Sequence, residues 1–235
     1  MTLHIVEHPL VAHYLTRLRD KETTPDEFRE ASDKIITLLL YEATRDLRSR
    51  AFTMQTPLEE TKGHAIDDRV VAVPILRAGL GLVGPVLELL PHVTVGYIGL
   101  ERDERTAVAS RYYVKLPPDI AGKAVMILDP MLATGGTALK AVEIMKEYRP
   151  ASVRLVCVVA APEGIQALQA AHPDVAIFTA ARDRELNAQK YILPGLGDYG
   201  DRLPVLRQAA PRHQGEGRHD SRPDARHRRN RHKGR

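Results

Sequence analysis

The sequence predicts an α/β fold, a mostly parallel twisted sheet flanked by helices. Short apolar runs have the length of strands, are rich in valine and isoleucine and do not alternate with polar residues; they lie at 70–75, 93–100, 124–128, 153–159 and 175–179. Such runs are typical of strands buried on both faces, as in a parallel sheet. Helical stretches at 79–90, 136–148 and 163–171 separate several of them. This alternation indicates right-handed crossovers within one sheet.

A helix over residues 25–48 is predicted ahead of these strands. Thr24 can cap it, Pro25 suits its first position, and Glu27 completes a capping box with Thr24. Its apolar face is wide and includes Phe28, Ala31, Ile35, Ile36, Leu38, Leu39 and Leu40. Such a face is buried on more than one side, either in the chain's own core or at a subunit contact. We therefore expect a homodimer or a larger homo-oligomer.

Composition indicates a globular protein of a reducing compartment. The 235 residues, 43% of them hydrophobic, suffice for one buried core. The single cysteine, Cys157, is expected to be a small buried hydrophobe and excludes a disulfide framework. His4, Glu7 and His8 interrupt the N-terminus where a signal peptide would be apolar. No apolar stretch reaches the roughly 20 residues of a membrane span, so we expect a cytoplasmic protein without a membrane partner.

Charge is distributed unevenly and divides the chain in two. Residues 207–235 hold ten Lys/Arg and three Asp/Glu, a net charge of +7. Of the chain's 34 basic and 30 acidic residues, 24 and 27 remain in residues 1–206, a net charge of −3. We expect one domain at 1–206 and a basic, disordered tail at 207–235, because the tail lacks large apolar side chains. Nucleic acid would be bound only through this tail, if at all.

The segment between the strand at 124–128 and the following helix is the most informative. It comprises Asp129, Pro130, Met131, Leu132, Ala133, Thr134, Gly135, Gly136 and Thr137. Turn glycines let the backbone approach an anion, and the first N–H groups of the helix point at it. The threonine hydroxyls add donors, and Asp129 can accept hydrogen bonds from sugar hydroxyls. The segment indicates a sugar-phosphate cradle; the alternative is an ordinary strand-to-helix turn.

This segment resembles the phosphoribosyl pyrophosphate loop of type I phosphoribosyltransferases. Most of that superfamily have two adjacent acids here, whereas Asp129-Pro130 is similar to the uracil phosphoribosyltransferase branch. The resemblance implies the type I phosphoribosyltransferase fold. It also implies that the segment binds phosphoribosyl pyrophosphate, with Asp129 on the ribose and residues 134–137 on the 5′-phosphate.

A second match is the run Tyr191-Ile192-Leu193-Pro194-Gly195-Leu196-Gly197-Asp198-Tyr199-Gly200-Asp201-Arg202. Taken alone, this Gly/Pro-rich run predicts a surface turn. In uracil phosphoribosyltransferases the loop forms a hood over the base. The resemblance implies that the backbone at Ile192, Gly197, Asp198 and Tyr199 pairs with uracil, and that Asp198 contacts the donor or its Mg²⁺.

Two arginines complete the predicted site. Arg77 lies in the run Pro74-Ile75-Leu76-Arg77-Ala78-Gly79-Leu80-Gly81, and Arg102 in Leu100-Glu101-Arg102-Asp103-Glu104. An arginine within an apolar run is costly if unpaired. Arg77 therefore either pairs with a structural carboxylate or, together with Arg102, grips the pyrophosphate in bidentate geometry. By resemblance, residues 103–115, with Tyr112 and Tyr113, form a mobile arm over the site.

The three motifs imply an enzyme of pyrimidine salvage. It would convert uracil and phosphoribosyl pyrophosphate to uridine monophosphate and pyrophosphate, with Mg²⁺ as cofactor and with Arg102 and Asp198 as catalytic residues. Parts of the family are activated by GTP, which makes GTP a candidate activator. One alternative is a pyrimidine-responsive RNA-binding regulator of the same fold, against which the −3 charge of residues 1–206 argues. Another is a phosphoribosyltransferase for a different base.

Overall fold

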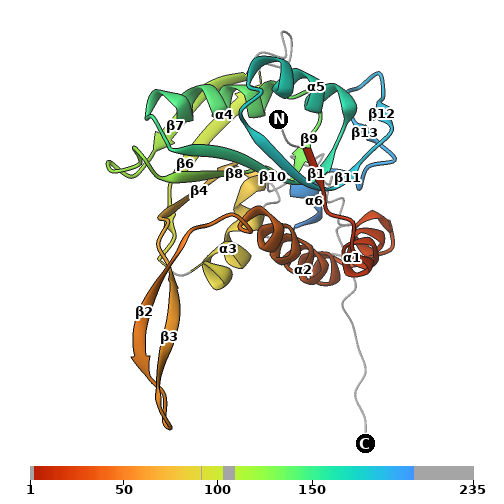
Figure 1. The fold of residues 1–235 in the computed structure, drawn as a ribbon. Helices are drawn as coiled ribbons and strands as arrows, with labels where there is room; N and C mark the ends of the chain where they lie inside the picture. The colour runs from red at the N-terminus through yellow and green to blue at the C-terminus, as the bar shows by residue number, and fades with distance from the viewer. Residues whose placement is uncertain (1–2, 91, 103–108, 204–235) are drawn as a thin grey trace, which may run out of the picture.

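The computed structural model describes residues 3–90, 92–102 and 109–203. The predicted tail at 207–235 and the first part of the predicted arm lie outside these residues. Figure 1 shows a central sheet with helices on both of its faces. The sheet order is β1 (Leu3–Ile5), β11 (Ala176–Arg182), β10 (Ser152–Ala160), β8 (Ala124–Leu128), β4 (Val70–Leu76), β6 (Tyr97–Arg102) and β7 (Ala109–Lys115).

The prediction of a mostly parallel sheet is confirmed. Every pair along this order is parallel except β6 with β7, which is antiparallel. The run predicted at 124–128 coincides with β8, whose residues are all buried. The run predicted at 93–100 is two strands, β5 (Thr94–Val95) and β6, separated by Gly96. A Cβ on Gly96 would lie 2.7 Å from Leu116 Cδ2, so the chain bends there against the loop that follows β7.

Helices cover both faces and create two hydrophobic clusters. The helices α4 (Gly136–Glu147) and α5 (Pro162–Ala171) lie on one face, and α1 (Pro9–Arg19), α2 (Pro25–Ala43) and α3 (Val83–Leu89) lie on the other (Figure 1). The helix predicted at 79–90 is a 3-10 helix, η1 (Ala78–Leu82), followed by α3. Cys157 is fully buried in the α4 side, and this burial raises the pKa of its thiol to about 12. None of the helices in the described part of the chain is long and apolar enough to cross a membrane.

Helix α2 begins as predicted but ends earlier. The Thr24 hydroxyl accepts from the Glu27 amide, and the Glu27 carboxylate accepts from the Thr24 amide at 3.0 Å, which confirms the capping box. The predicted end at residue 48 is wrong, because α2 stops at Ala43. There the Arg154 guanidinium, which reaches in from β10, donates to the Ala43 carbonyl and to the Asp46 carboxylate. A contact remote in sequence therefore ends the helix.

The wide apolar face of α2 is covered within the chain itself. Ile35, Ile36, Leu39 and Leu40 are each 0% exposed in a single chain, and α2 packs against α1, α3, β10 and β11. Of the two explanations for that face, burial in the chain's own core is the correct one. The wide apolar face of α2 therefore gives no support to a subunit contact.

A hairpin that the sequence analysis did not predict projects from the body. Its strands are β2 (Ser49–Gln55) and β3 (Glu60–Ile66), which pair with each other and with no other strand of the described residues (Figure 1). Phe52 and Met54 are each 41% exposed and lie over Gly63. Phe52 and Met54 alternate with Thr53 and Gln55, which was a recognisable strand pattern.

Candidate functional site

Parallel strands bring the two predicted arginines and the predicted sugar-phosphate cradle, residues 129–137, to one edge of the sheet. We call residues 129–137 the phosphate loop. Pro74 of β4 pairs with Leu128 of β8, and Leu76 of β4 pairs with Gly99 of β6. Arg77 therefore follows the carboxyl end of β4, and Asp129 follows that of β8. Arg102 is the last residue of β6 at the same edge. Ligands of α/β sheets bind at this edge.

The phosphate loop is held rigidly by β10 and α5. The Pro130 carbonyl accepts from the Val158 amide at 2.9 Å, and β9 (Met131–Leu132) pairs with the end of β10. A Cβ on Gly164 of α5 would lie 2.4 Å from the Ala133 carbonyl oxygen. The helix α5 can approach the loop this closely only because residue 164 is a glycine.

The loop presents the amino terminus of α4. Gly135 precedes the helix with a φ of +86° and, as the N-cap residue, has no side chain with which to bond the first-turn amides. A small hollow of about 20 Å³ lies there, lined by Asp129, Met131, Leu132, Ala133, Gly135, Thr137 and Ala138. The amides of a helix's first turn and the helix dipole favour an anion at such a position. Asp129 and Thr134 are both partly buried beside it.

Arg77 stands on a tight turn that touches the other two motifs. The residue is exposed, directly after the buried strand β4, so it lies at the edge of the apolar run and not inside it. A Cβ on Gly79 would lie 2.4 Å from the Leu128 carbonyl, at the start of the phosphate loop. A Cβ on Gly81 would lie 2.6 Å from Leu203 and 3.1 Å from the Tyr199 ring. These two glycines therefore let three segments distant in sequence meet.

The predicted hood is an ordered loop beside this turn. It runs from β13 (Ile192–Leu193), which pairs with β12 (Glu185–Leu186), to the short helix α6 (Tyr199–Arg202). Gly195 and Gly197 have φ values of +63° and +81°. Asp198 is exposed and caps α6, since its carboxylate accepts from the Asp201 amide at 3.0 Å.

Tyr199 is anchored in the core by its side chain. Its ring is 1% exposed, packs edge-on against Phe28 of α2 at 5.4 Å, and its hydroxyl forms a hydrogen bond with Ser32. Burial raises the pKa of this phenol. The ring therefore points into the core, so a ligand at this residue would meet its main chain.

The available acidic side chains fit a magnesium ion held mainly by a substrate. Among the described residues no three His, Cys, Asp or Glu side chains form a cluster that could hold a metal. Asp129 lines the hollow at the start of α4, and Asp198 lies exposed in the hood. Mg²⁺ is commonly bound by one or two carboxylates together with substrate phosphates and water, which this arrangement can provide.

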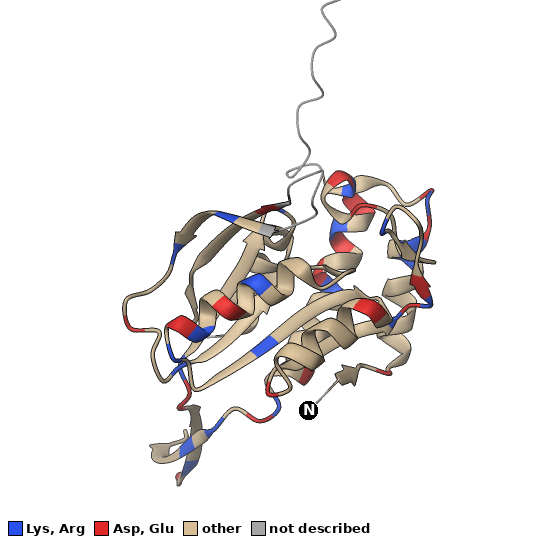
Figure 2. Ribbon diagram, turned by 90° about the horizontal axis from the view of Figure 1, so that it is seen from above, with Lys and Arg blue, Asp and Glu red and all other residues tan. Residues whose placement is uncertain are grey.

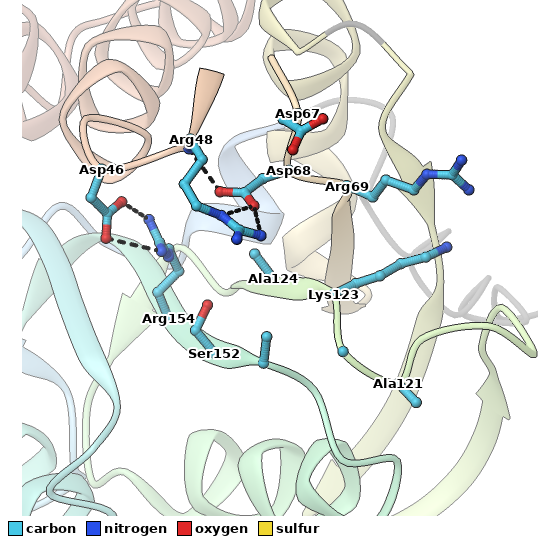
Figure 3. A pocket seen from close by; sticks show the side chains of 12 residues that line it. Asp46, Arg48, Asp67, Asp68, Arg69, Ala121, Lys123, Ala124, Ser152 and Arg154 are labelled. Atoms are coloured by element: carbon cyan, nitrogen blue, oxygen red, sulfur yellow. Dashed lines mark hydrogen bonds and ion pairs between the residues drawn. The ribbon is translucent and has the colours of Figure 1, made fainter. Parts of the chain in front are cut away.

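A large cavity lies at the opposite edge of the sheet. It has a volume of about 680 Å³, lies at the amino ends of β4, β8 and β10, and is lined by charged side chains (Figure 3). Four of these charges form two pairs, Arg154 with Asp46 at 2.7 Å and Arg48 with Asp68 at 2.6 Å. The hydrogen bonds from the two arginines lower the pKa of Asp46 and of Asp68. The cavity is thus a structural ion-pair cluster away from the ligand-binding edge.

The sheet order, the glycine turn before α4 and the hood define a type I phosphoribosyltransferase. The family model described as uracil phosphoribosyltransferase matches residues 5–203. The chain therefore belongs to the uracil phosphoribosyltransferase family.

Similar proteins agree with this assignment along almost their whole length. A uracil phosphoribosyltransferase of Thermosipho africanus is 52% identical over 204 residues, which cover 86% of this chain and 98% of the relative. That of Dictyoglomus turgidum is 51% identical over 200 residues, or 85% and 97% of the two chains. The solved structure of the AQ2163 protein from Aquifex aeolicus is 36% identical, with a TM-score of 0.82, and the match covers 87% of this chain and 99% of that one.

Proposed function

We propose that this chain transfers the ribose 5-phosphate of phosphoribosyl pyrophosphate to uracil. In this reaction the bond from C1 of the ribose to pyrophosphate breaks, a bond from C1 to a ring nitrogen of uracil forms, and that nitrogen loses its proton. The observation that supports it best is the meeting of the three motifs through Gly79 and Gly81. Membership of the family names uracil as the base.

The phosphate loop would hold the sugar phosphate. The α4 amides, with the hydroxyls of Thr134 and Thr137, are suited to the 5′-phosphate, because helix amino termini favour anions. Asp129, at the end of β8, is suited to the ribose hydroxyls. The remaining loop residues, Pro130 to Ala133, would shape the backbone around the donor.

The negative charge of the departing pyrophosphate would be stabilised by residues outside the phosphate loop. Arg77 follows β4 and Arg102 ends the neighbouring parallel strand β6. Both would bind the departing pyrophosphate, which guanidinium groups suit by their bidentate geometry. Asp198 would act beside the donor and its metal. Mg²⁺, when bound with the donor, would neutralise part of the pyrophosphate charge. Catalysis would then depend on positioning and electrostatics and need no protein nucleophile.

Uracil would be recognised by the main chain of the hood. Uracil offers alternating carbonyl and N–H groups, which backbone amides at Ile192 and at 197–199 can complement. The buried ring of Tyr199 supports this, because a loop anchored from behind can present its backbone in a fixed orientation.

We propose a homodimer or larger homo-oligomer on the evidence of the hairpin β2–β3. A two-stranded hairpin alone is marginally stable in water, and this one exposes Phe52, Met54 and Leu58, the last 94% exposed. Covering it with a second copy of the chain would bury these side chains. Light scattering that gave a monomer mass at micromolar concentration would contradict this.

The location, the activator and the absence of RNA binding are further parts of the proposal. The single buried cysteine supports a reducing, cytoplasmic location. GTP is proposed as an activator only because parts of the family are activated by it, and the proposal predicts a rise in kcat or a fall in KM when GTP is added. In Figure 2 acidic and basic residues are interspersed over helices and loops, which disfavours an RNA-binding role for the described residues.

One assay tests the function. Purified protein is given phosphoribosyl pyrophosphate, Mg²⁺ and, in turn, uracil, hypoxanthine, adenine and orotate, and pyrophosphate release is measured. Release with uracil alone is expected. Release with a purine and none with uracil would overturn the proposal.

A further inference from the structure

The hood is fixed to the rest of the protein by the ion pair of Arg19 with the buried Asp183, to which the proposed reaction assigns no role. Asp183 follows β11, and its side chain is 3% exposed. Its amide donates to the carbonyl of Ala160, the last residue of β10, at 2.8 Å. A buried carboxylate is costly unless hydrogen bonds and an opposite charge compensate it. Its position therefore calls for an explanation.

The Asp183 carboxylate is fully engaged by two partners. Arg19, at the end of α1, donates to it through both terminal nitrogens, at 3.1 Å and 2.5 Å. The Gly195 amide donates to the same carboxylate at 3.0 Å. With its oxygens held in this way, Asp183 is poorly placed to take a proton from a substrate or to bind a metal.

The same pair holds both polar groups of Gly195. While Asp183 binds the Gly195 N–H, the Arg19 guanidinium donates to the Gly195 carbonyl at 2.8 Å. Gly195 has a φ of +63°, and a Cβ there would lie 2.3 Å from the Ile192 carbonyl. The backbone at this residue is thus fixed by groups outside the loop.

A second arginine continues this anchoring along the loop. Arg202 donates to the Leu196 carbonyl at 2.9 Å and to the Asp20 carbonyl at 2.6 Å, and its guanidinium lies 4.3 Å from the centre of the Phe28 ring. The carbonyls of Gly195 and Leu196 therefore both face arginines tied to the end of α1. The residues that follow, from Gly197 onward, carry amides proposed to meet the base.

We propose that Asp183 and Arg19 are positioning residues for uracil recognition. They fix the peptide groups of Gly195, and thereby the direction in which the amides of residues 197–199 point. This rests on the proposed function, in which those amides bind the base. Hydrogen bonds weaken steeply when the donor–hydrogen–acceptor angle departs from linearity. A displacement of about 1 Å can lower a rate about 100-fold, so a small shift of the hood is enough to weaken uracil binding. The phosphate loop has its own anchors on β10 and α5 and does not depend on this pair.

The test separates the two substrates in steady-state kinetics of the full chain. Asp183→Asn removes the negative charge of the pair. Arg19→Lys keeps the positive charge but loses the planar guanidinium that bonds both the Asp183 carboxylate and the Gly195 carbonyl. Both variants are expected to raise the KM for uracil by about tenfold or more, with the KM for phosphoribosyl pyrophosphate within about twofold of wild type. Arg19→Lys is the milder change and carries the test if Asp183→Asn fails to fold.

Arg154→Lys is the matched control. Arg154 also joins a carboxylate to a backbone carbonyl, but at the opposite edge of the sheet. It should lower Tm and leave both KM values unchanged. If the Arg19 variant folds and raises both KM values equally, or neither, the pair is merely structural and the inference is overturned. A wild-type protein without uracil turnover would instead overturn the proposed function.

Discussion

The hydroxyls of Tyr199 and Ser32 form a hydrogen bond inside the core and thereby link α6 to α2. Both residues are 1% exposed, and 167 positions separate them along the chain. The bond satisfies two polar groups that would be costly to bury alone. It fixes the far end of the hood, as Asp183 and Arg19 fix its beginning.

Removal of one hydroxyl of this pair should be more harmful than removal of both. Ser32→Ala leaves the buried phenol without its partner and should lower the free energy of unfolding by about 1–3 kcal/mol. In the double variant, with Tyr199→Phe, much of this loss should be recovered. Urea unfolding of the wild type, both single variants and the double variant gives the coupling energy. Additive effects would show that the bond contributes nothing.

Asp198→Asn should reduce kcat sharply without unfolding the protein. Asparagine is as good a helix N-cap as aspartate, so the cap on α6 should survive, while the charge proposed to act beside the donor is lost. Stopped-time assays of uridine monophosphate formation measure the effect. A rate within about threefold of wild type, or about 0.6 kcal/mol, would contradict a catalytic role.

Gly164→Ala should disturb the phosphate loop from behind. The new methyl group would lie 2.4 Å from the Ala133 carbonyl, so the loop or α5 must move. We expect a raised KM for phosphoribosyl pyrophosphate and a loss of about 1–3 kcal/mol in stability. Gly84→Ala in α3 is the control, because nothing lies within 4 Å of its Cβ and alanine favours a helix. Equal behaviour of the two variants would refute the close packing.

The Asp46–Arg154 pair should make stability depend on acid pH. The hydrogen bond from Arg154 lowers the pKa of Asp46 below its ordinary value of 3.8. The pair therefore stabilises the fold above the unfolded-state pKa, and this contribution is lost as the pH falls through the lower folded-state value. Asp46→Asn should be less stable than wild type at pH 7, and the difference should shrink below about pH 4. A difference that does not change with pH would exclude the ionic contribution.

A chain truncated after Leu206 should retain full catalytic activity. The family match ends at residue 203, and every proposed site residue lies before that position. The kcat/KM for uracil of the truncated and full chains should agree within error. Loss of activity in a truncated protein with unchanged circular dichroism would mean that residues 207–235 take part in the enzyme.

Some features were determined by the sequence itself, because they depend on neighbouring residues. The Thr24 cap needs only Glu27 three positions later, and the strand 124–128 needs only a buried apolar run before a glycine turn. The phosphate loop could be proposed for the same reason, since the amides expected to bind an anion come from one continuous segment. Periodicity and composition suffice where the interacting groups are a few residues apart.

Only the tertiary structure decided features that depend on segments distant in the sequence. Packing decided that the wide apolar face of α2 is covered by the chain's own core and not by a partner. The end of α2 depended on Arg154, which lies more than a hundred residues away in the sequence. Gly79 and Gly81 belonged to a recognised motif, but their role appears only where Leu128, Tyr199 and Leu203 approach them. The Arg19–Asp183 pair spans 164 positions, and neither residue stands in a recognisable pattern. Such contacts follow from how the layers pack, which local propensity does not specify.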